Sequence, residues 1–256
     1  MSTLDLFRLD GKTALITGAS RGLGKQMAIA LGDAGANLVV TARTADDLDA
    51  AAGEIRDETG AEVLAVTADV TSPEDAEMMF ARTSERFGGT DVLINNAGTN
   101  VRAPLVDYSL EDWRKVTETN ITGVFLTTKA CLPGMIERGW GRVINIGSIM
   151  GSVGLPTRVT YAATKGAVHQ ITRTLAQEVA QHGITVNTIA PGPFMTEMNK
   201  PVMDDEETYN FFIDRIPLGR WGKPEELRGV AVFLASEASS FVTDATIYVD
   251  GGWTTH

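Results

Sequence analysis

The chain has 256 residues, 43% hydrophobic and 21% charged, so it can bury a sizeable core and we do not expect disorder. Its formal net charge of -11 opposes attraction to a nucleic-acid backbone or an anionic membrane surface, so neither is an expected partner. The single cysteine, Cys131, excludes an intrachain disulfide, and the N-terminal segment lacks the basic and apolar runs of a secretory signal, so we expect a cytoplasmic protein.

Two further classes of protein are not expected. No apolar stretch approaches the roughly 18 residues that a membrane span needs. The histidines are scattered as His169, His182 and His256 and form no metal-binding motif, so we expect no metal.

Short apolar segments rich in β-branched residues alternate with longer helical patterns along the chain. The predicted strands are 12–17, 37–42, 62–67, 91–95, 142–148, 184–189 and 245–249, and the helices between them include 22–34, 46–59 and 73–87. Such alternation requires crossover connections, so the sheet should be mainly parallel and covered on both faces. We therefore predict an α/β protein, a single doubly wound Rossmann domain over residues 1–256 with a seven-stranded sheet.

The segment 194–218 departs from this alternation. It contains the acidic run 204–207 and the apolar group 211–213. An insertion of this kind after a strand is typical of a lid over a site, and a pair of surface helices is the alternative.

A glycine-rich turn follows the first predicted strand. In Thr17-Gly18-Ala19-Ser20-Arg21-Gly22-Leu23-Gly24 the glycines permit a tight turn and close approach of the backbone to a phosphate. The helix that begins there offers free N–H groups and the positive end of its dipole. The turn therefore predicts a pyrophosphate site, formed by Gly18, Ser20, Arg21, Gly22, Leu23 and Gly24.

The end of the second predicted strand bears on the choice of cofactor. Rossmann folds that use NAD usually place an acid there, but this chain has Ala42 followed by Arg43. A guanidinium can hold a 2'-phosphate, and Arg21 is a second cation near the same place. The sequence predicts NADP, with NAD as the alternative if Arg43 only closes a loop beside Asp46 and Asp47.

The pattern Tyr161-Ala162-Ala163-Thr164-Lys165 places a phenol and an ammonium on one face of a predicted helix. The ordinary pKa of tyrosine, about 10, is too high for a ready base, but a nearby positive charge lowers it. Tyr161 is therefore the predicted proton-transfer residue, with Lys165 beside it; alone, the pattern is also typical of a solvent-facing pair.

Segments 17–24 (TGASRGLG) and 95–98 (NNAG), Ser148 and the Tyr161–Lys165 pair occur in a characteristic order and spacing. By these motifs the chain, from Leu9 to Gly252, resembles the short-chain dehydrogenase/reductase family. The resemblance implies an enzyme that interconverts a secondary alcohol and a ketone by hydride transfer.

The resemblance also implies roles for a catalytic set. Ser148, rather than the nearby Ser152, would bind the substrate oxygen. Asn120 would join a water chain that carries the proton from Lys165 toward solvent. Lys165 and Tyr161 would also contact the cofactor.

Further cofactor contacts follow from the same resemblance. Asp69 and Val70 would lie at the adenine, although Asp69 could instead cap the next helix. The adenine ribose would be bordered by Asn96, Ala97 and Gly98. The nicotinamide side would be formed by Pro191, Gly192, Phe194 and Thr196.

Substrate identity rests on weaker signals. Segments 7–12 and 220–226, together with Arg102, resemble the gluconate 5-dehydrogenase branch of the family, in which Arg102 would bind a sugar-acid carboxylate near Ser148 and Tyr161. A loop arginine with a structural partner is the alternative reading of Arg102.

Two other functions stay open. A 3-oxoacyl thioester reductase, acting on an acyl carrier protein, shares the same motifs, but an acidic carrier needs a basic patch and none is evident. A nucleotide sensor without turnover is the third hypothesis. In each case a small-molecule ligand is the expected partner, and the resemblance implies a homotetramer with the segment 245–256 near an interface, unless that segment is ordinary core.

Overall fold

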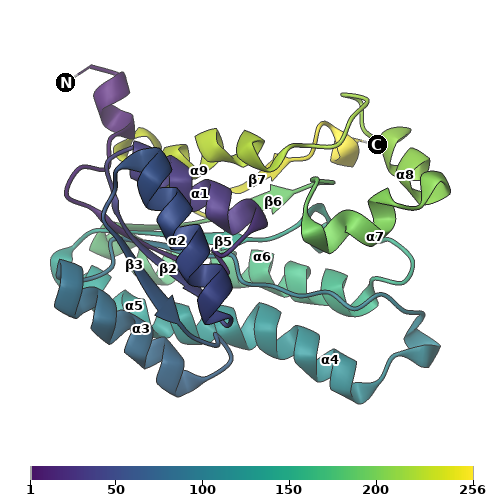
Figure 1. Ribbon diagram of the computed structural model, residues 1–256, viewed down its shortest axis with the longest axis horizontal. Helices are drawn as coiled ribbons and strands as arrows, with labels where there is room; N and C mark the ends of the chain where they lie inside the picture. Colours follow the sequence, from purple (N-terminus) through teal and green to yellow (C-terminus); the bar gives the residue numbers. More distant parts are fainter. Residues whose placement is uncertain (1, 256) are drawn as a thin grey trace.

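A computed structural model describes residues 2–255 as one seven-stranded sheet between two layers of helices (Figure 1). The strand order is β3-β2-β1-β4-β5-β6-β7, and all six neighbouring pairs are parallel. The predicted doubly wound fold and its sheet are therefore confirmed. The strands are β1 (Thr13–Thr17), β2 (Asn37–Ala42), β3 (Val63–Thr67), β4 (Val92–Asn95), β5 (Gly141–Ile146), β6 (Ile184–Pro191) and β7 (Thr246–Val249).

The helices pack on the sheet through two separate apolar cores. Along β1, Ala14 and Ile16 face one core while Leu15 faces the other, as the alternation of side chains in a strand requires. The first core is covered by α1 (Gly22–Asp33), α2 (Ala45–Thr59) and α9 (Arg228–Ala235). The opposite layer contains α3 (Pro73–Phe87), α4 (Leu110–Thr117), α5 (Gly123–Arg138) and α6 (Val159–Val179).

Helix ends follow local sequence signals. Ser72 caps α3 by accepting a hydrogen bond from the Asp75 amide at 3.1 Å, and Pro73 occupies the first helical position. The same helix ends at Gly88, whose φ of 82° is favourable only for glycine. Among the described residues no helix is long and apolar enough to cross a membrane.

Two predicted strand ends were each wrong by two residues. The fifth strand ends at Ile146, two residues before Ser148, because Ser148 instead begins a short helical turn (Ile149–Gly151). The sixth strand continues to Pro191, so residues 190 and 191, which we expected beyond the strand, belong to it.

Asn120 lies in a π-helical turn, Glu118–Thr122, between α4 and α5. An asparagine inside a helix favours a local departure from α geometry because its side chain competes for hydrogen bonds. The helical path from α4 to α5 is therefore irregular at Asn120.

The segment 194–218 folds as α7 (Lys200–Met203) and α8 (Glu206–Ile213), which lie together at the right of Figure 1. Val202 and Phe212 pack there against Trp221, and Tyr209 stacks on Trp221 with ring centres 5.9 Å apart. The segment therefore has a small apolar core of its own, apart from the two cores of the sheet.

Buried amides and hydroxyls join the carboxyl ends of β4 and β5 to α5 and α6. Asn95 donates to Asn145 at 2.8 Å and to Thr128 at 2.9 Å, and it accepts from Thr127 at 2.6 Å. Asn145 donates in turn to Thr172 on α6 at 2.9 Å. All five side chains are buried, so each group depends on its partner to replace water.

Replacing Asn95 with leucine should destabilise the protein, because the amide of Asn145 and the hydroxyl of Thr127 each lose a partner in the core. We expect the free energy of unfolding to fall by about 2–4 kcal/mol, measured by urea unfolding. The exposed Leu110→Ala serves as the control and should change it by less than about 0.5 kcal/mol. Equal midpoints for wild type and Asn95→Leu would show that the network contributes nothing.

Candidate active site

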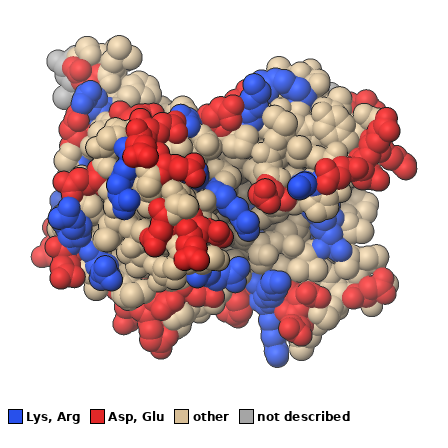
Figure 2. All heavy atoms as spheres, in the orientation of Figure 1, with Lys and Arg blue, Asp and Glu red and all other residues tan. Residues whose placement is uncertain are grey.

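A cavity of about 880 Å³ lies at the carboxyl ends of the central strands, where β1 has β2 on one side and β4 on the other. Ligands of open α/β sheets bind at such a reversal of strand order. Figure 2 shows a hollow in this face, whereas acidic side chains gather over α2. The predicted residues that line the cavity are Gly18, Ser20, Arg21, Gly22, Leu23, Arg43, Asp69, Val70, Asn96, Ala97, Gly98, Arg102, Ser148, Tyr161, Lys165, Pro191, Gly192, Phe194 and Thr196.

Two predicted residues, Gly24 and Asn120, do not line the cavity but support its wall. A Cβ on Gly24 would lie 2.5 Å from the Gly18 carbonyl oxygen, so the close packing of α1 on the turn requires glycine. Asn96 holds the turn from the other side, donating to the carbonyl oxygens of Thr17 and Gly18 at 2.9 Å each.

The N-terminus of α1 opens toward the cavity. Gly22 has a φ of 58°, and the nearest atom to a Cβ built on it is the Thr196 methyl group at 3.9 Å. No side chain caps the first turn of the helix. The free amides and the helix dipole therefore face open space, as an anion site requires.

Arg21 and Arg43 line the same part of the cavity and are both exposed. Within residues 2–255 neither side chain makes a hydrogen bond or ion pair, so the Arg43 side chain does not close a loop beside Asp46 and Asp47. Ala42 is the last residue of β2, where an acid would bind ribose hydroxyls. This end of the cavity thus offers two guanidinium groups and no acid at the strand end.

The side chain of Asp69 is held in place by hydrogen bonds within its own turn. Its carboxylate accepts hydrogen bonds from the Thr71 amide at 2.9 Å and the Thr71 hydroxyl at 2.8 Å, and its amide donates to Asp75 at 2.7 Å. The cap of α3 is Ser72, so the alternative role of Asp69 as that cap is wrong.

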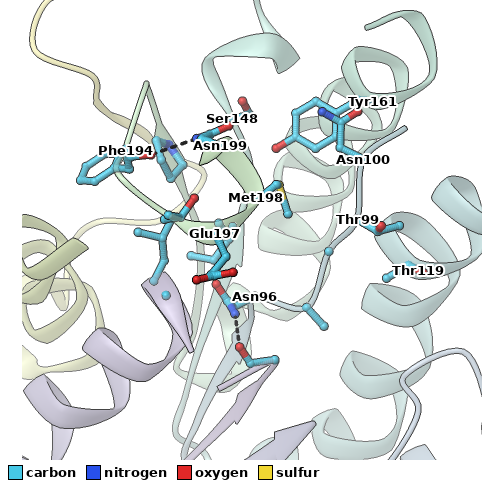
Figure 3. A pocket seen from close by; sticks show the side chains of 18 of the residues that line it. Asn96, Thr99, Asn100, Thr119, Ser148, Tyr161, Phe194, Glu197, Met198 and Asn199 are labelled. Atoms are coloured by element: carbon cyan, nitrogen blue, oxygen red, sulfur yellow. Dashed lines mark hydrogen bonds between the residues drawn. The ribbon is translucent and has the colours of Figure 1, made fainter. Parts of the chain in front are cut away.

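Ser148 and Tyr161 meet at the opposite end of the cavity. The Ser148 hydroxyl accepts a hydrogen bond from the Met150 amide at 3.1 Å, and the residue is 7% exposed. Tyr161 lies in the first turn of α6, and Figure 3 shows its hydroxyl pointing into the cavity on the side of Ser148 and Met198. Two hydroxyls are thus available to one substrate oxygen.

Lys165 and Asn120 each donate a hydrogen bond to a main-chain carbonyl oxygen. The Lys165 ammonium donates to the carbonyl oxygen of Ile146 at 2.6 Å. The Asn120 amide donates to the Thr99 carbonyl at 3.0 Å and accepts from the Thr99 amide at 2.8 Å, so it joins the π turn to the loop after β4. Burial lowers the pKa of Lys165 to about 8, because the charged form loses its hydration.

Burial raises the pKa of Tyr161, while the Ser148 hydroxyl and the positive charges of Arg102 and Arg158 lower it. From the sequence we assigned the lowering to Lys165. Its ammonium lies 5.7 Å from the centre of the Tyr161 ring and donates a hydrogen bond to the main-chain carbonyl of Ile146. The arginines are therefore the protein charges that favour tyrosinate, and burial outweighs them.

Arg102 connects the loop after β4 to the segment 194–218. Its Nη2 donates to the Met198 carbonyl at 2.9 Å and to the Asn199 side chain at 3.1 Å, while its buried Nε has no partner among the described residues. Arg102 therefore has structural partners, as expected for a loop arginine, and it also lines the cavity. Asn199 also donates to the carbonyl oxygen of Phe194 at 3.0 Å, a contact drawn in Figure 3.

Sequence reasoning missed Arg158, which lines the cavity just before α6. It is the N-cap residue of α6 and lies three positions before Tyr161, so both residues belong to the start of that helix. That spacing was the available signal. Among residues 2–255 no group of three or more His, Cys, Asp or Glu is placed to hold a metal.

Comparisons with known proteins agree over nearly the full chain. A family described as enoyl-(acyl carrier protein) reductase matches residues 18–254. Gluconate 5-dehydrogenase of Gluconobacter oxydans is 42% identical, over 99% of each chain, and a 3-oxoacyl-[acyl-carrier-protein] reductase of Vibrio cholerae is 39% identical, over 95% of this chain and 98% of the other. The crystal structure of a gluconate 5-dehydrogenase from Burkholderia cenocepacia, in complex with NADP and tartrate, superposes with a TM-score of 0.96 at 41% identity and full coverage of both chains.

The lowered pKa of Lys165 should make stability depend on pH. Between its folded value of about 8 and its ordinary 10.5 the unfolded chain holds a proton that the folded chain has released, so the free energy of unfolding rises with pH. Cys131, whose pKa burial raises from 9.0 to about 12, opposes this rise above pH 9, which leaves pH 8 to 9 as the clean window.

In that window the free energy of unfolding of the wild type should rise more steeply with pH than that of Lys165→Met, by up to about 1.4 kcal/mol per pH unit. Urea unfolding of both proteins at several pH values measures the two slopes. Parallel slopes would show that Lys165 keeps its ordinary pKa in the folded protein.

Proposed function

The chain belongs to the short-chain dehydrogenase/reductase family of oxidoreductases, and we propose from this premise that it interconverts a secondary alcohol and a ketone on a sugar acid, with NADP. Gluconate and 5-ketogluconate are the first pair to test. The observation that carries the proposal is the meeting of Ser148, Tyr161 and Lys165 at one end of a cavity whose other end is the glycine turn.

The residues of the cavity fit a dinucleotide with a 2'-phosphate. The uncapped N-terminus of α1 would receive the pyrophosphate, and the space beside Gly22 is open. Arg21 and Arg43 would hold the 2'-phosphate, with Asp69 and Val70 at the adenine and Asn96, Ala97 and Gly98 at its ribose. Pro191, Gly192, Phe194 and Thr196 would border the nicotinamide. The Burkholderia cenocepacia protein, with NADP in its crystal, supports this choice.

When bound, NADP supplies the hydride acceptor, and its reduced form the donor. In the oxidation the alcohol O–H proton passes to the Tyr161 phenolate as the carbinol C–H bond breaks with its electron pair, and the C–O bond becomes C=O. Ser148 donates a hydrogen bond to the same oxygen and stabilises its charge. Lys165 would hold the nicotinamide ribose, and a water chain past Asn120 would return the proton to solvent.

We favour a sugar acid as the substrate because Arg102 lines the cavity and its Nε has no hydrogen-bond partner among the described residues. A guanidinium matches a carboxylate in shape and charge. The similar 5-dehydrogenase of Gluconobacter oxydans supports the same choice. The second candidate, a 3-oxoacyl thioester reductase, is favoured by the Vibrio cholerae relative, and the description of the matching family also names an acyl carrier protein.

A sensor without turnover is disfavoured, because binding alone needs no Ser148, Tyr161 and Lys165 in one place. Following cofactor absorbance with sugar acids, polyols, ketones and acyl thioesters separates the three functions. Oxidation of gluconate supports the proposal, turnover of acyl thioesters alone supports the second candidate, and no turnover supports the sensor.

Three further features complete the proposal. The segment 194–218 acts as a lid, supported by the Arg102 contacts to its first turn. The protein is a homotetramer with an interface beside the edge strand β7, where Tyr248 and the fully exposed Phe241 lie. It resides in the cytoplasm, a reducing compartment in which the lone buried Cys131 stays free.

Arg43→Ala should weaken NADP binding by about 10- to 100-fold, because a charge-assisted contact to the 2'-phosphate is lost. NAD binding should change by less than about threefold, since NAD lacks that phosphate. Titration of protein fluorescence with each nucleotide measures both affinities, and the exposed Arg82→Ala on α3 is the matched control. Tighter binding of NAD than of NADP by the wild type would contradict the assignment.

Tyr161→Phe should lower turnover by roughly 1,000-fold, because the proton-transfer group is removed while the ring is kept. NADP affinity should stay within about threefold of the wild type. Tyr108→Phe, which loses only a 3.4 Å hydrogen bond to the Val101 carbonyl, is the control. Unchanged turnover in Tyr161→Phe would reject the proposed proton transfer.

A further inference from the structure

Arg158 shares the substrate end of the cavity with Tyr161. It is the residue immediately before α6, it is half-buried, and it lines the cavity together with Arg102 and Ser148. The positive charges of both arginines lower the pKa of the Tyr161 phenol. Arg158 therefore faces the space that a substrate would occupy.

The hydrogen bonds of the two arginines differ. The Nη2 atom of Arg102 donates hydrogen bonds to the Met198 carbonyl oxygen and the Asn199 side chain. The Nη1 atom of Arg158 donates a hydrogen bond to the Thr157 hydroxyl oxygen at 2.7 Å and a longer one to the Thr157 carbonyl oxygen at 3.4 Å. Nε and Nη2 of Arg158 make no hydrogen bond within the described chain, and this is the edge of the guanidinium that can bind both oxygens of a carboxylate.

Thr157, which holds Arg158, has an unusual backbone conformation. Its φ of 64° is unfavourable for a β-branched residue, and Asp244 is the only other described non-glycine residue with positive φ. Such strain persists where the surrounding structure fixes it, and it concentrates at functional sites. Here it directs the Thr157 hydroxyl onto the guanidinium of Arg158.

Arg102 and Arg158 bring two positive charges to the lining of the cavity. Neither arginine forms an ion pair with an acid in the described part of the chain. Burial and the repulsion from Arg102 lower the pKa of Arg158 to about 10. Two like charges that are partly removed from water and face one space favour an anion between them.

The surroundings of Arg158 strengthen this attraction. Leu155, Phe212 and Trp221 line the same cavity and pack in one apolar cluster, and Trp221 is 3% exposed. Apolar walls keep water away and lower the local dielectric, so a contact between opposite charges gains strength.

We propose that Arg158 is a specificity residue that, together with Arg102, holds the substrate carboxylate and makes the enzyme prefer a sugar acid to a neutral polyol. This inference rests on the proposed function and adds a residue to it. A neutral polyol would leave both guanidinium groups without a counter-charge. Arg158 thus determines the class of substrate, while Tyr161 and Ser148 carry out the chemistry.

The test measures binding in a complex that cannot turn over. D-gluconate or D-glucitol is titrated by calorimetry into protein saturated with NADPH, which cannot accept a hydride from either. The proteins are the wild type, Arg158→Gln, Arg158→Lys and the control Arg173→Gln. Arg173 lies on the same helix, 59% exposed and 3.7 Å from Asp244, outside the cavity. Circular dichroism checks that each variant is folded.

Arg158→Gln should weaken gluconate binding by about 10- to 100-fold, as expected for the loss of a hydrogen bond between charged groups. Arg158→Lys should recover part of the loss, because it keeps the charge without the planar fork. Glucitol should bind weakly and equally to all four proteins, and Arg173→Gln should match the wild type.

Gluconate binding to Arg158→Gln within about twofold of the wild type would overturn the inference, as would an equal loss for gluconate and glucitol, which would indicate a structural role. A separate assay with NADP and gluconate tests the proposed function. Wild type that binds gluconate through Arg158 but never reduces NADP would overturn the proposed function alone. Wild type that binds no gluconate would overturn both.

Discussion

The close contact between the turn after β1 and the turn after β4 determines the geometry of the whole cavity. The Asn96 side chain donates hydrogen bonds to two carbonyl oxygens of the first turn. The Thr17 hydroxyl oxygen accepts hydrogen bonds from the main-chain amides of Asn96 and Ala97, at 3.0 Å each. A Cβ on Gly18 would lie 2.9 Å from the Ala97 Cα, so a larger residue would separate the turns. This contact holds the N-terminus of α1 across from Tyr161, and thereby sets the distance between a phosphate site and a proton-transfer site.

The sequence was sufficient to predict what depends on local pattern. Alternating apolar segments predicted the sheet, and nearly all predicted site residues line one cavity, because the carboxyl ends of parallel strands meet at one edge. The strand end before Ser148 was wrong, since apolarity continues beyond Ile146 although the backbone turns there. Whether the site residues have the roles given to them stays a prediction.

What the sequence could not show depends on contacts between distant segments. The bond from Arg102 to Met198 joins positions 96 residues apart, and no local pattern indicates it. The lowering of the Tyr161 pKa by Arg102 and Arg158 likewise depends on how a loop and α6 are placed. A motif showed which groups do the chemistry, whereas packing shows which charges surround them. The class of substrate therefore depends on how packing places these charges around the motif.

The central claim is that one substrate oxygen lies between Tyr161 and Ser148 while the nucleotide extends to Arg43. The most direct measurement is a crystal structure of the protein with NADP and 5-ketogluconate. The account predicts the ketone oxygen within about 3 Å of both hydroxyls and the 2'-phosphate bound by Arg43. A sugar acid bound with its ketone away from Tyr161, or a nucleotide whose ribose phosphate is not in contact with Arg43, would contradict it.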